Sequence, residues 1–282
     1  MKTIAIVGLG LIGGSMAVDL RRRGYAGEII GVENERLNAE AALKIGLADR
    51  IAGHEEAFSK ADVIILAIPV GAAAKILPEA LDAAAGTGKL VIDVCSVKEA
   101  MCQAAKGHAG RANYVATHPM AGTEYSGPWA AMPGLFDGRA CIFCDSEESS
   151  AEALKEAETL YGVLNMRISY MQSKAHDTHV AYVSHISHIT SFALALTVLD
   201  KEKDEKHIFD LASGGFSSTV RLAKSNADMW VPILSLNRDN VLHVTDTYIE
   251  KMKQFREAVA AGDEARIREL IEEANKIKRI IR

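Results

Sequence analysis

Short apolar runs alternate with amphipathic segments through the first half of the chain. The run at 63–68 is uniformly apolar, which is typical of a strand buried on both faces of a parallel sheet. Amphipathic helices are predicted at 12–23, 36–45 and 73–85. Strands are predicted at 3–7, 28–32, 63–68, 90–93, 114–117 and 140–144. Strands that alternate with helices, joined by right-handed crossovers, predict a doubly wound, Rossmann-type α/β fold.

The pattern changes after about residue 167, where strand signals give way to helical periodicity. Gly262 and Asp263 form a stop and a restart, because Gly ends one helix and Asp caps the next. Helices are predicted at 172–199, 205–212, 223–243, 245–261 and 263–281. We therefore expect a dinucleotide-binding domain at 1–168 and an all-α substrate-binding domain at 169–282.

Charge and composition exclude several classes of protein. Lys and Arg number 32 against 37 Asp and Glu, and this balance argues against a nucleic-acid binder. Residues 63–77 form an apolar stretch, but Pro69, Gly71 and Lys75 interrupt it, so we expect no membrane span. The N-terminus shows no small-residue cleavage site. These observations predict a soluble, cytoplasmic protein.

Four cysteines are too few for a secreted disulfide scaffold. Cys141 and Cys144 have the C-x-x-C spacing of zinc and redox sites. Their segment is a predicted strand, however, on which residues three apart point to opposite faces. We expect four reduced thiols in or near the core and no metal site.

The segment Gly8-Leu9-Gly10-Leu11-Ile12-Gly13 matches G-x-G-x-x-G, with a strand before it and a helix after it. Gly8 permits a tight turn, Gly10 lets the backbone approach a pyrophosphate, and Gly13 lets helix and strand pack closely. The helix N-terminus supplies N–H groups to the phosphates. All six residues are therefore candidates for binding a dinucleotide.

Glu33 follows the second predicted strand, where an acidic residue binds the adenosine ribose hydroxyls. A carboxylate there repels the extra phosphate of NADP, so we expect NAD, although Arg36 leaves NADP open. Ile68, Pro69 and Ser96 follow two further strands, where they would line the nicotinamide half of the cleft. Ser96 is alternatively a helix N-cap.

His118 follows a predicted strand and opens a turn-rich stretch at 120–138. Histidine accepts protons near neutral pH, which suits a general base. The spacing alone leaves open a histidine that merely bonds the turn backbone.

Four histidines lie on the predicted helix at 172–199. In a regular helix His185 and His188 share one face, whereas His176 and His179 lie on another, so the four cannot chelate one metal. His188 lies on a mostly apolar face, where it is either a satisfied core histidine or a substrate ligand.

Arg221 follows Gly214 and Gly215, which we expect to form a flexible turn before a helix. A guanidinium can bind a carboxylate in a bidentate way. The alternative for Arg221 is a surface ion pair.

Together these segments resemble the prephenate dehydrogenase family of tyrosine biosynthesis. The resemblance runs over nearly the whole chain and rests on GLGLIGGS, DVCSVK, HPMAGTE, HD-x-x-x-A-x-x-SH-x-x-H and GGF-x-x-x-x-R-x-A-x-S-x-x-x-MW. It implies oxidation and decarboxylation of prephenate with NAD, and a homodimer built through the helical domain. Family members often have charged residues after GGF, where this chain has Ser217 and Ser218, which puts an ionic gate there in doubt.

The resemblance also implies roles for individual residues. His118 would be the catalytic base, and Ser96 would orient the substrate hydroxyl and the nicotinamide. Arg221 would bind a substrate carboxylate and His188 would contact the substrate. The remaining residues expected near the substrate are Thr123, Glu124, Ser184 and Trp230.

Three alternatives stay open at this point. The enzyme could oxidise arogenate, the amino analogue of prephenate, alone or in addition. It could be a β-hydroxyacid-type dehydrogenase or imine reductase with a similar domain plan. Finally, it could be a dimeric NAD-binding sensor or scaffold without turnover.

Overall fold

A computed structural model describes residues 1–203 and 208–280. Positions 205–207 of one predicted helix and position 281 of another lie outside the described residues. The chain divides into two compact units, Met1–Asn237 and Arg238–Arg282. The domain boundary expected at 168/169 stays a prediction.

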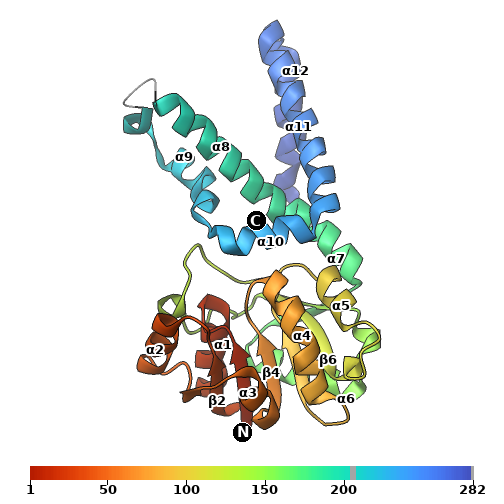
Figure 1. Ribbon diagram of the computed structural model, residues 1–282. Helices are drawn as coiled ribbons and strands as arrows, with labels where there is room; N and C mark the ends of the chain where they lie inside the picture. The colour runs from red at the N-terminus through yellow and green to blue at the C-terminus, as the bar shows by residue number, and fades with distance from the viewer. Residues whose placement is uncertain (204–207, 281–282) are drawn as a thin grey trace. The chain divides into compact units, whose positions relative to one another are not determined.

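The first unit is built on an eight-stranded sheet with the order β3-β2-β1-β4-β5-β6-β7-β8 (Figure 1). Neighbouring strands are parallel except β6 and β7, which pair antiparallel. The strands are β1 Lys2–Val7, β2 Ala26–Val32, β3 Arg50–Ile51, β4 Val63–Leu66, β5 Leu90–Asp93, β6 Tyr114–Pro119, β7 Ala140–Cys144 and β8 Arg167–Met171. The predicted α/β fold is confirmed, with the correction that the sheet is not wholly parallel.

Helices cover both faces of the sheet and bury two separate apolar clusters. Met16 and Leu20 of α1 join Leu160 of α6 in the cluster on one face, whereas Phe58 of α3 and Leu77 of α4 lie in the other. The helices are α1 Leu11–Arg22, α2 Arg36–Lys44, α3 His54–Lys60, α4 Val70–Ala84, α5 Glu99–Ala105 and α6 Ala151–Val163.

The sequence pattern missed five elements of this layer: β3, β8, α3, α5 and α6. The predicted strand 63–68 ends at Leu66, and α4 begins at Val70 rather than at 73. All four cysteines are buried free thiols, as expected, and Cys141 and Cys144 lie on β7.

The strand order reverses between β1 and β4. From β1 the chain builds outward through β2 and β3, then returns to add β4 and β5 on the other side. The turn after β1 and the turn after β4 therefore open at the same edge of the sheet. Ligands of doubly wound folds bind at such a switch point.

The predicted helix 172–199 is observed as three joined segments. These are α7 Ser173–Val180, a π-helical segment Ala181–His185, and α8 Ile186–Glu202. By length and composition alone, the combined run Ser173–Glu202 is apolar enough to cross a membrane. The π-helical segment has no counterpart in the sequence prediction.

The rest of the first unit is made of shorter helices. A 3₁₀ turn, Ile208–Leu211, falls within the predicted helix 205–212. The expected loop at Gly214 and Gly215 is wrong, because both residues begin α9, Gly214–Thr219. A 3₁₀ turn, Arg221–Lys224, and α10, Ala227–Leu236, complete this unit.

The second unit contains α11 Arg238–Ala261, α12 Glu264–Ala274 and a 3₁₀ turn Asn275–Arg279. The predicted break between 243 and 245 is wrong, because α11 runs through it. The predicted restart at Gly262 and Asp263 is confirmed, since Gly262 has φ +63° and the Asp263 side chain caps α12 by accepting from the Arg266 amide.

Candidate active site

The glycine-rich turn after β1 has the geometry of a phosphate cradle. Gly8 has φ +88°, and a Cβ on Gly13 would lie 2.0 Å from the Gly8 carbonyl oxygen. A Cβ on Gly10, in contrast, would meet no atom closer than 3.9 Å. Gly10 caps α1, whose first turn, begun by Leu11 and Ile12, carries no acidic residue. The open space above Gly10 and the exposed helix dipole fit a pyrophosphate.

Glu33 lies beside this turn. Its carboxylate accepts hydrogen bonds from the amides of Leu9, at 3.4 Å, and Glu35, at 3.1 Å. The carboxylate is thereby held at the carboxyl end of β2, where a ribose hydroxyl can reach it. Arg36, the residue that left NADP open, pairs instead with Glu40 at 2.7 Å.

The segments after β4 and β5 approach each other. The Ile68 carbonyl accepts a hydrogen bond from the Cys95 thiol, at 3.7 Å, and Pro69 stands at the start of α4. Ser96 is half-buried beside Cys95. The N-cap alternative for Ser96 is wrong, because α5 begins at Glu99 with Lys98 as its N-cap residue.

His118 lies inside β6 rather than after it, because pairing with antiparallel β7 extends the strand to Pro119. Its side chain is buried, and burial is the main cause that lowers its pKa well below the usual value. The nearby charges of His176, Lys98 and His185 lower it further. The imidazole is therefore neutral at physiological pH and free to accept a proton.

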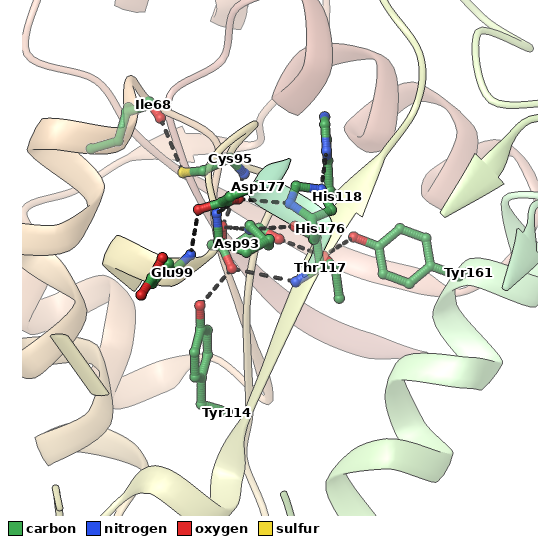
Figure 2. A network of polar contacts seen from close by, with 11 residues as sticks. Ile68, Asp93, Cys95, Glu99, Tyr114, Thr117, His118, Tyr161, His176 and Asp177 are labelled. Atoms are coloured by element: carbon green, nitrogen blue, oxygen red, sulfur yellow. Dashed lines mark hydrogen bonds and ion pairs between the residues drawn. The ribbon is translucent and has the colours of Figure 1, made fainter. Parts of the chain in front are cut away.

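His176 and Asp177 of α7 connect His118 to the start of α5 (Figure 2). The His118 Nδ1 atom lies 2.8 Å from His176 Nε2, and His176 Nδ1 lies 2.8 Å from Asp177 Oδ1. The Asp177 carboxylate accepts from the backbone amides of Lys98, at 2.8 Å, and Glu99, at 2.9 Å. The first amides of α5 thus receive their acceptor from another helix.

A buried ion pair lies below His118. Lys98 and Asp93 are both fully buried and in contact, and the Lys98 ammonium also donates to the Thr117 carbonyl at 2.6 Å. The Tyr114 hydroxyl donates to Asp93 at 2.6 Å (Figure 2). The ammonium therefore has two buried acceptors, and its positive charge lies next to β6, the strand that carries His118.

Trp230 of α10 contacts two of the helical histidines. His188 stacks on the indole with ring centroids 3.5 Å apart, and His185 meets it edge-on at 5.8 Å. His188 Nδ1 bonds the Ser184 carbonyl at 3.1 Å, which leaves its Nε2 available to a ligand. Within the described residues, the Trp230 indole Nε1 is buried without a hydrogen-bond partner. An unsatisfied buried donor of this kind is expected where a ligand supplies the acceptor.

Arg221 approaches the loop that follows His118. Its Nη1 lies 3.4 Å from Glu124 Oε2, and its charge lowers the pKa of His188 after the larger effect of burial. Thr123 is exposed in the same loop, and its hydroxyl accepts from the Tyr125 amide at 3.3 Å. Arg221 is thus paired with Glu124 and acts electrostatically on His188, while His185, which contacts the same indole as His188, lowers the pKa of His118.

The π-helical segment corrects the expected distribution of the histidines. His176 and His185 would lie on opposite sides of a regular helix, but the wider turn between them rotates later positions by about 100°. The Asn237 amide lies 2.7 Å from the Asp177 carbonyl oxygen and 3.2 Å from His185 Nδ1. Both histidines are buried, and both lower the pKa of His118. Among the described residues no cluster of His, Cys, Asp and Glu has the arrangement of a metal site.

Sequence reasoning did not single out Asp93, Lys98, His176, Asp177 or Asn237 as site residues. His176 and Asp177 were visible in the sequence as an HD pair, but a regular helix would place them on a different face from His188. Lys98 and Asp93 carried a usable signal, because charged residues flank the end of a fully apolar strand.

The fold and the site together define a dinucleotide-binding oxidoreductase with a helical region that contributes polar residues. The family profile described as "Prephenate dehydrogenase, nucleotide-binding domain" matches residues 16–170, and the profile described as "Prephenate dehydrogenase, dimerization domain" matches residues 172–273. The chain belongs to the prephenate dehydrogenase family.

Individual relatives agree with this assignment. The prephenate dehydrogenase of Bacillus subtilis is 30% identical over 263 residues, which are 93% of this chain and 71% of that protein. The crystal structure of Aquifex aeolicus prephenate dehydrogenase with hydroxyphenyl propionate and NAD⁺ is 27% identical, with a TM-score of 0.85 over 99% of this chain and 98% of that chain. The structure of Synechocystis arogenate dehydrogenase is 28% identical, with a TM-score of 0.76 over 98% of each chain.

Proposed function

We propose that this enzyme oxidises prephenate with NAD, releasing 4-hydroxyphenylpyruvate, carbon dioxide and NADH. The observation that supports this function best is that a buried, neutral imidazole and a guanidinium both act on one group of aromatic and histidine side chains. His185 lowers the pKa of His118, His185 and His188 both contact Trp230, and the charge of Arg221 lowers the pKa of His188. Prephenate carries a ring hydroxyl at one end and carboxylates at the other, so it requires a base and a cation a few ångströms apart.

NAD bound at the glycine-rich turn would supply the acceptor for the hydride that leaves the ring carbon carrying the hydroxyl. Gly8, Leu9, Gly10, Leu11, Ile12 and Gly13 would hold its pyrophosphate, and Glu33 its adenosine ribose. Ile68, Pro69 and Ser96 would line the nicotinamide half of the site.

His118 takes the hydroxyl proton as the carbon–hydrogen bond breaks. The new carbonyl withdraws the electron pair that is released when the ring carboxylate leaves as carbon dioxide, and the ring becomes aromatic. The phenol oxygen then recovers its proton from His118, which returns to the neutral form. Ser96 would orient the hydroxyl.

The other end of the substrate would lie against the helical region. Arg221 would bind a carboxylate, and in doing so would exchange its contact with Glu124 for one with the substrate. The unpartnered Trp230 indole would donate a further hydrogen bond, and His188 would contact the substrate beside it. Thr123 and Ser184 would complete this part of the site.

Steady-state assays of NADH formation test the proposal. We expect turnover with prephenate and NAD, and we expect His118→Asn to lower kcat by about 10²–10⁴-fold, the usual contribution of a general base. NAD affinity, measured by titration, should change little. An unaltered kcat in this variant would remove His118 from the mechanism, and a wild-type protein that binds NAD without turnover would instead indicate a sensor or scaffold.

Arogenate is the second candidate substrate, since an arogenate dehydrogenase is among the structural relatives. Prephenate is favoured because Arg221 offers positive charge and Trp230 a hydrogen-bond donor to the side chain, where an amine would require an acidic partner. Comparison of kcat/KM for both substrates, with NAD and with NADP, distinguishes these activities and also tests the role of Glu33.

We also propose that two copies associate through the region that matches the dimerization profile, and that the enzyme works in the cytoplasm. The run Ser173–Glu202 is long and apolar enough to span a membrane, and only 11% of its most apolar 18-residue window is buried inside the protein. Near its start Asp177 binds the N-terminus of α5, so the run is part of the folded domain. A second copy would cover its exposed apolar face.

A further inference from the structure

His118, His176 and Asp177 form a continuous line of buried hydrogen bonds (Figure 2). His176 and Asp177 are each 1% exposed, and both links in the line measure 2.8 Å. They reach His118 from α7, whereas His118 belongs to β6. Two separate elements therefore meet at this contact.

The direction of each hydrogen bond follows from the Asp177 end. Backbone amides can only donate, and those of Lys98 and Glu99 point at both carboxylate oxygens. Asp177 thus has the bonding pattern of a carboxylate, and His176 Nδ1 donates to it. His176 Nε2 must then accept, and its donor is the Nδ1–H of His118. This arrangement leaves His118 Nε2 without a proton, which is the form a base requires.

We propose that His176 and Asp177 are positioning residues that set the tautomer of His118 and share the positive charge it acquires. The role rests on the proposed function of His118 as the base. Histidine bases and ligands are commonly fixed by the partner of their second nitrogen. Here that partner is another imidazole, and the carboxylate acts one residue further away.

Asp177 is itself rigidly held. Its carboxylate binds the first amides of α5, and its carbonyl accepts from Asn237 at 2.7 Å. Asp177 can therefore offset a positive charge on the imidazole pair without moving.

The other charges around the pair oppose that positive charge. Burial and the Lys98 ammonium lower the pKa of both His118 and His176, and His185 lowers that of His118. Asp177 acts in the opposite direction and raises the pKa of His176 by hydrogen bond and by charge, with a smaller contribution from Asp93. The base is thus kept neutral at rest, while Asp177 supports its protonation during turnover.

Three variants of the full chain separate orientation from charge. His176→Phe removes the acceptor for His118 Nδ1–H, whereas His176→Gln restores a carbonyl acceptor at a similar reach. Asp177→Asn keeps an acceptor for His176 but removes the charge. His179→Gln, an exposed histidine two residues beyond Asp177, serves as the matched control.

We expect His176→Phe to lower kcat for prephenate by about 10²-fold or more, and His176→Gln to recover most of that loss. Asp177→Asn should lower kcat by about 10–100-fold, the usual effect of losing such an outer partner. Because a carboxylate raises the pKa of the imidazole pair, its loss should also move the acid limb of the kcat/KM profile to lower pH. A purely structural role would lower the plateau and leave that limb in place.

Nitrogen-15 NMR of the histidine side chains tests the tautomer without turnover. In the wild-type protein the proton of His118 should reside on Nδ1, and in His176→Phe this preference should disappear. A proton on Nε2 in the wild type would overturn the inference, as would His176→Phe and Asp177→Asn variants within twofold of wild-type kcat. If His118→Asn remains active, the proposed function fails. If His118→Asn is inactive while His176→Phe and Asp177→Asn are fully active, only the positioning role of His176 and Asp177 is rejected.

Discussion

The side chains of this site show how burial sets chemistry at single residues. His118 and Lys98 are both buried, but their surroundings give them different charges. Lys98 contacts Asp93, and the carboxylate raises its pKa against the opposing effect of burial. Among the described residues no carboxylate contacts His118 directly, so burial lowers its pKa and it stays neutral. Two buried side chains thus differ in charge, because Lys98 is a cation whereas His118 is neutral.

The buried ion pair leads to a stability prediction. Lys98→Met should destabilise the fold by about 3–5 kcal/mol, because it leaves the Asp93 carboxylate buried without its partner. Urea unfolding measures the change. Lys60→Met is the matched control, since Lys60 contacts Glu56 at the surface and such pairs contribute about 0–1 kcal/mol. Equal effects of the two substitutions would show that the Lys98 contact gives no more than a surface pair.

Arg221 is the residue for which binding and catalysis can be separated. Arg221→Ala should raise KM for prephenate by about 10–150-fold, the range for a lost hydrogen bond to a charged group, with a smaller effect on kcat. Steady-state kinetics over a range of prephenate concentrations measure both constants. Lys224→Ala, in the same 3₁₀ turn, should leave KM unchanged. An unaltered KM in the Arg221 variant would reject the carboxylate role.

At the level of elements, the central strands and the glycine-rich turn could be predicted because their signals are local. Leu90–Asp93 and Ala140–Cys144 were predicted to the residue, since apolar runs and flanking turns define them. β8 could not be found in this way, because it lies at the sheet edge with three of its five residues exposed. α5 is short and depends on Asp177, which lies far away in sequence, for its N-terminal acceptor.

The residues of the candidate site also differ in whether local sequence signals could predict them. Gly8 and Glu33 follow strands, and His118 lies near the carboxyl end of β6, so the topology of the fold was enough to propose all three. His176 and Asp177 were not chosen, because a regular helix places them on another face than His185 and His188. The π-helical segment that rotates those later residues leaves no mark in hydrophobic periodicity. A segment of this kind is set by tertiary packing, in this case around Asn237 and Trp230.

The contact between β1 and α1 can be tested at Gly13. Gly13→Ala would place a Cβ 2.0 Å from the Gly8 carbonyl, so the helix must move away from the strand. We expect a loss of NAD binding and a lower melting temperature, measured by titration and by calorimetry. Gly162→Ala, in the helix α6 with no atom within 4 Å of the new Cβ, should instead stabilise the protein by about 0.5–1 kcal/mol. Tight NAD binding by the Gly13 variant would show that this close packing is not needed for the cradle.

At the scale of the whole molecule, the apolar side chains exposed on the run Ser173–Glu202 indicate that another surface covers them. Val183 and Leu196 are 69% and 62% exposed, and both lie within the region that matches the dimerization profile. Apolar patches of this kind mark interfaces in soluble proteins. If they meet a second copy, the double variant Val183→Asp and Leu196→Asp should sediment as a monomer, because burying two unpaired carboxylates costs more than the contact gains.

Leu37→Asp provides the control for this experiment. Leu37 is 78% exposed on α2, outside the region that matches the dimerization profile, so its substitution should leave a dimer intact. Analytical ultracentrifugation at micromolar concentration compares the three proteins. A wild-type protein that sediments as a monomer would contradict the proposed dimer. A double variant that stays dimeric would place the interface elsewhere on the molecule, because two carboxylates facing each other across a two-fold axis cannot remain buried.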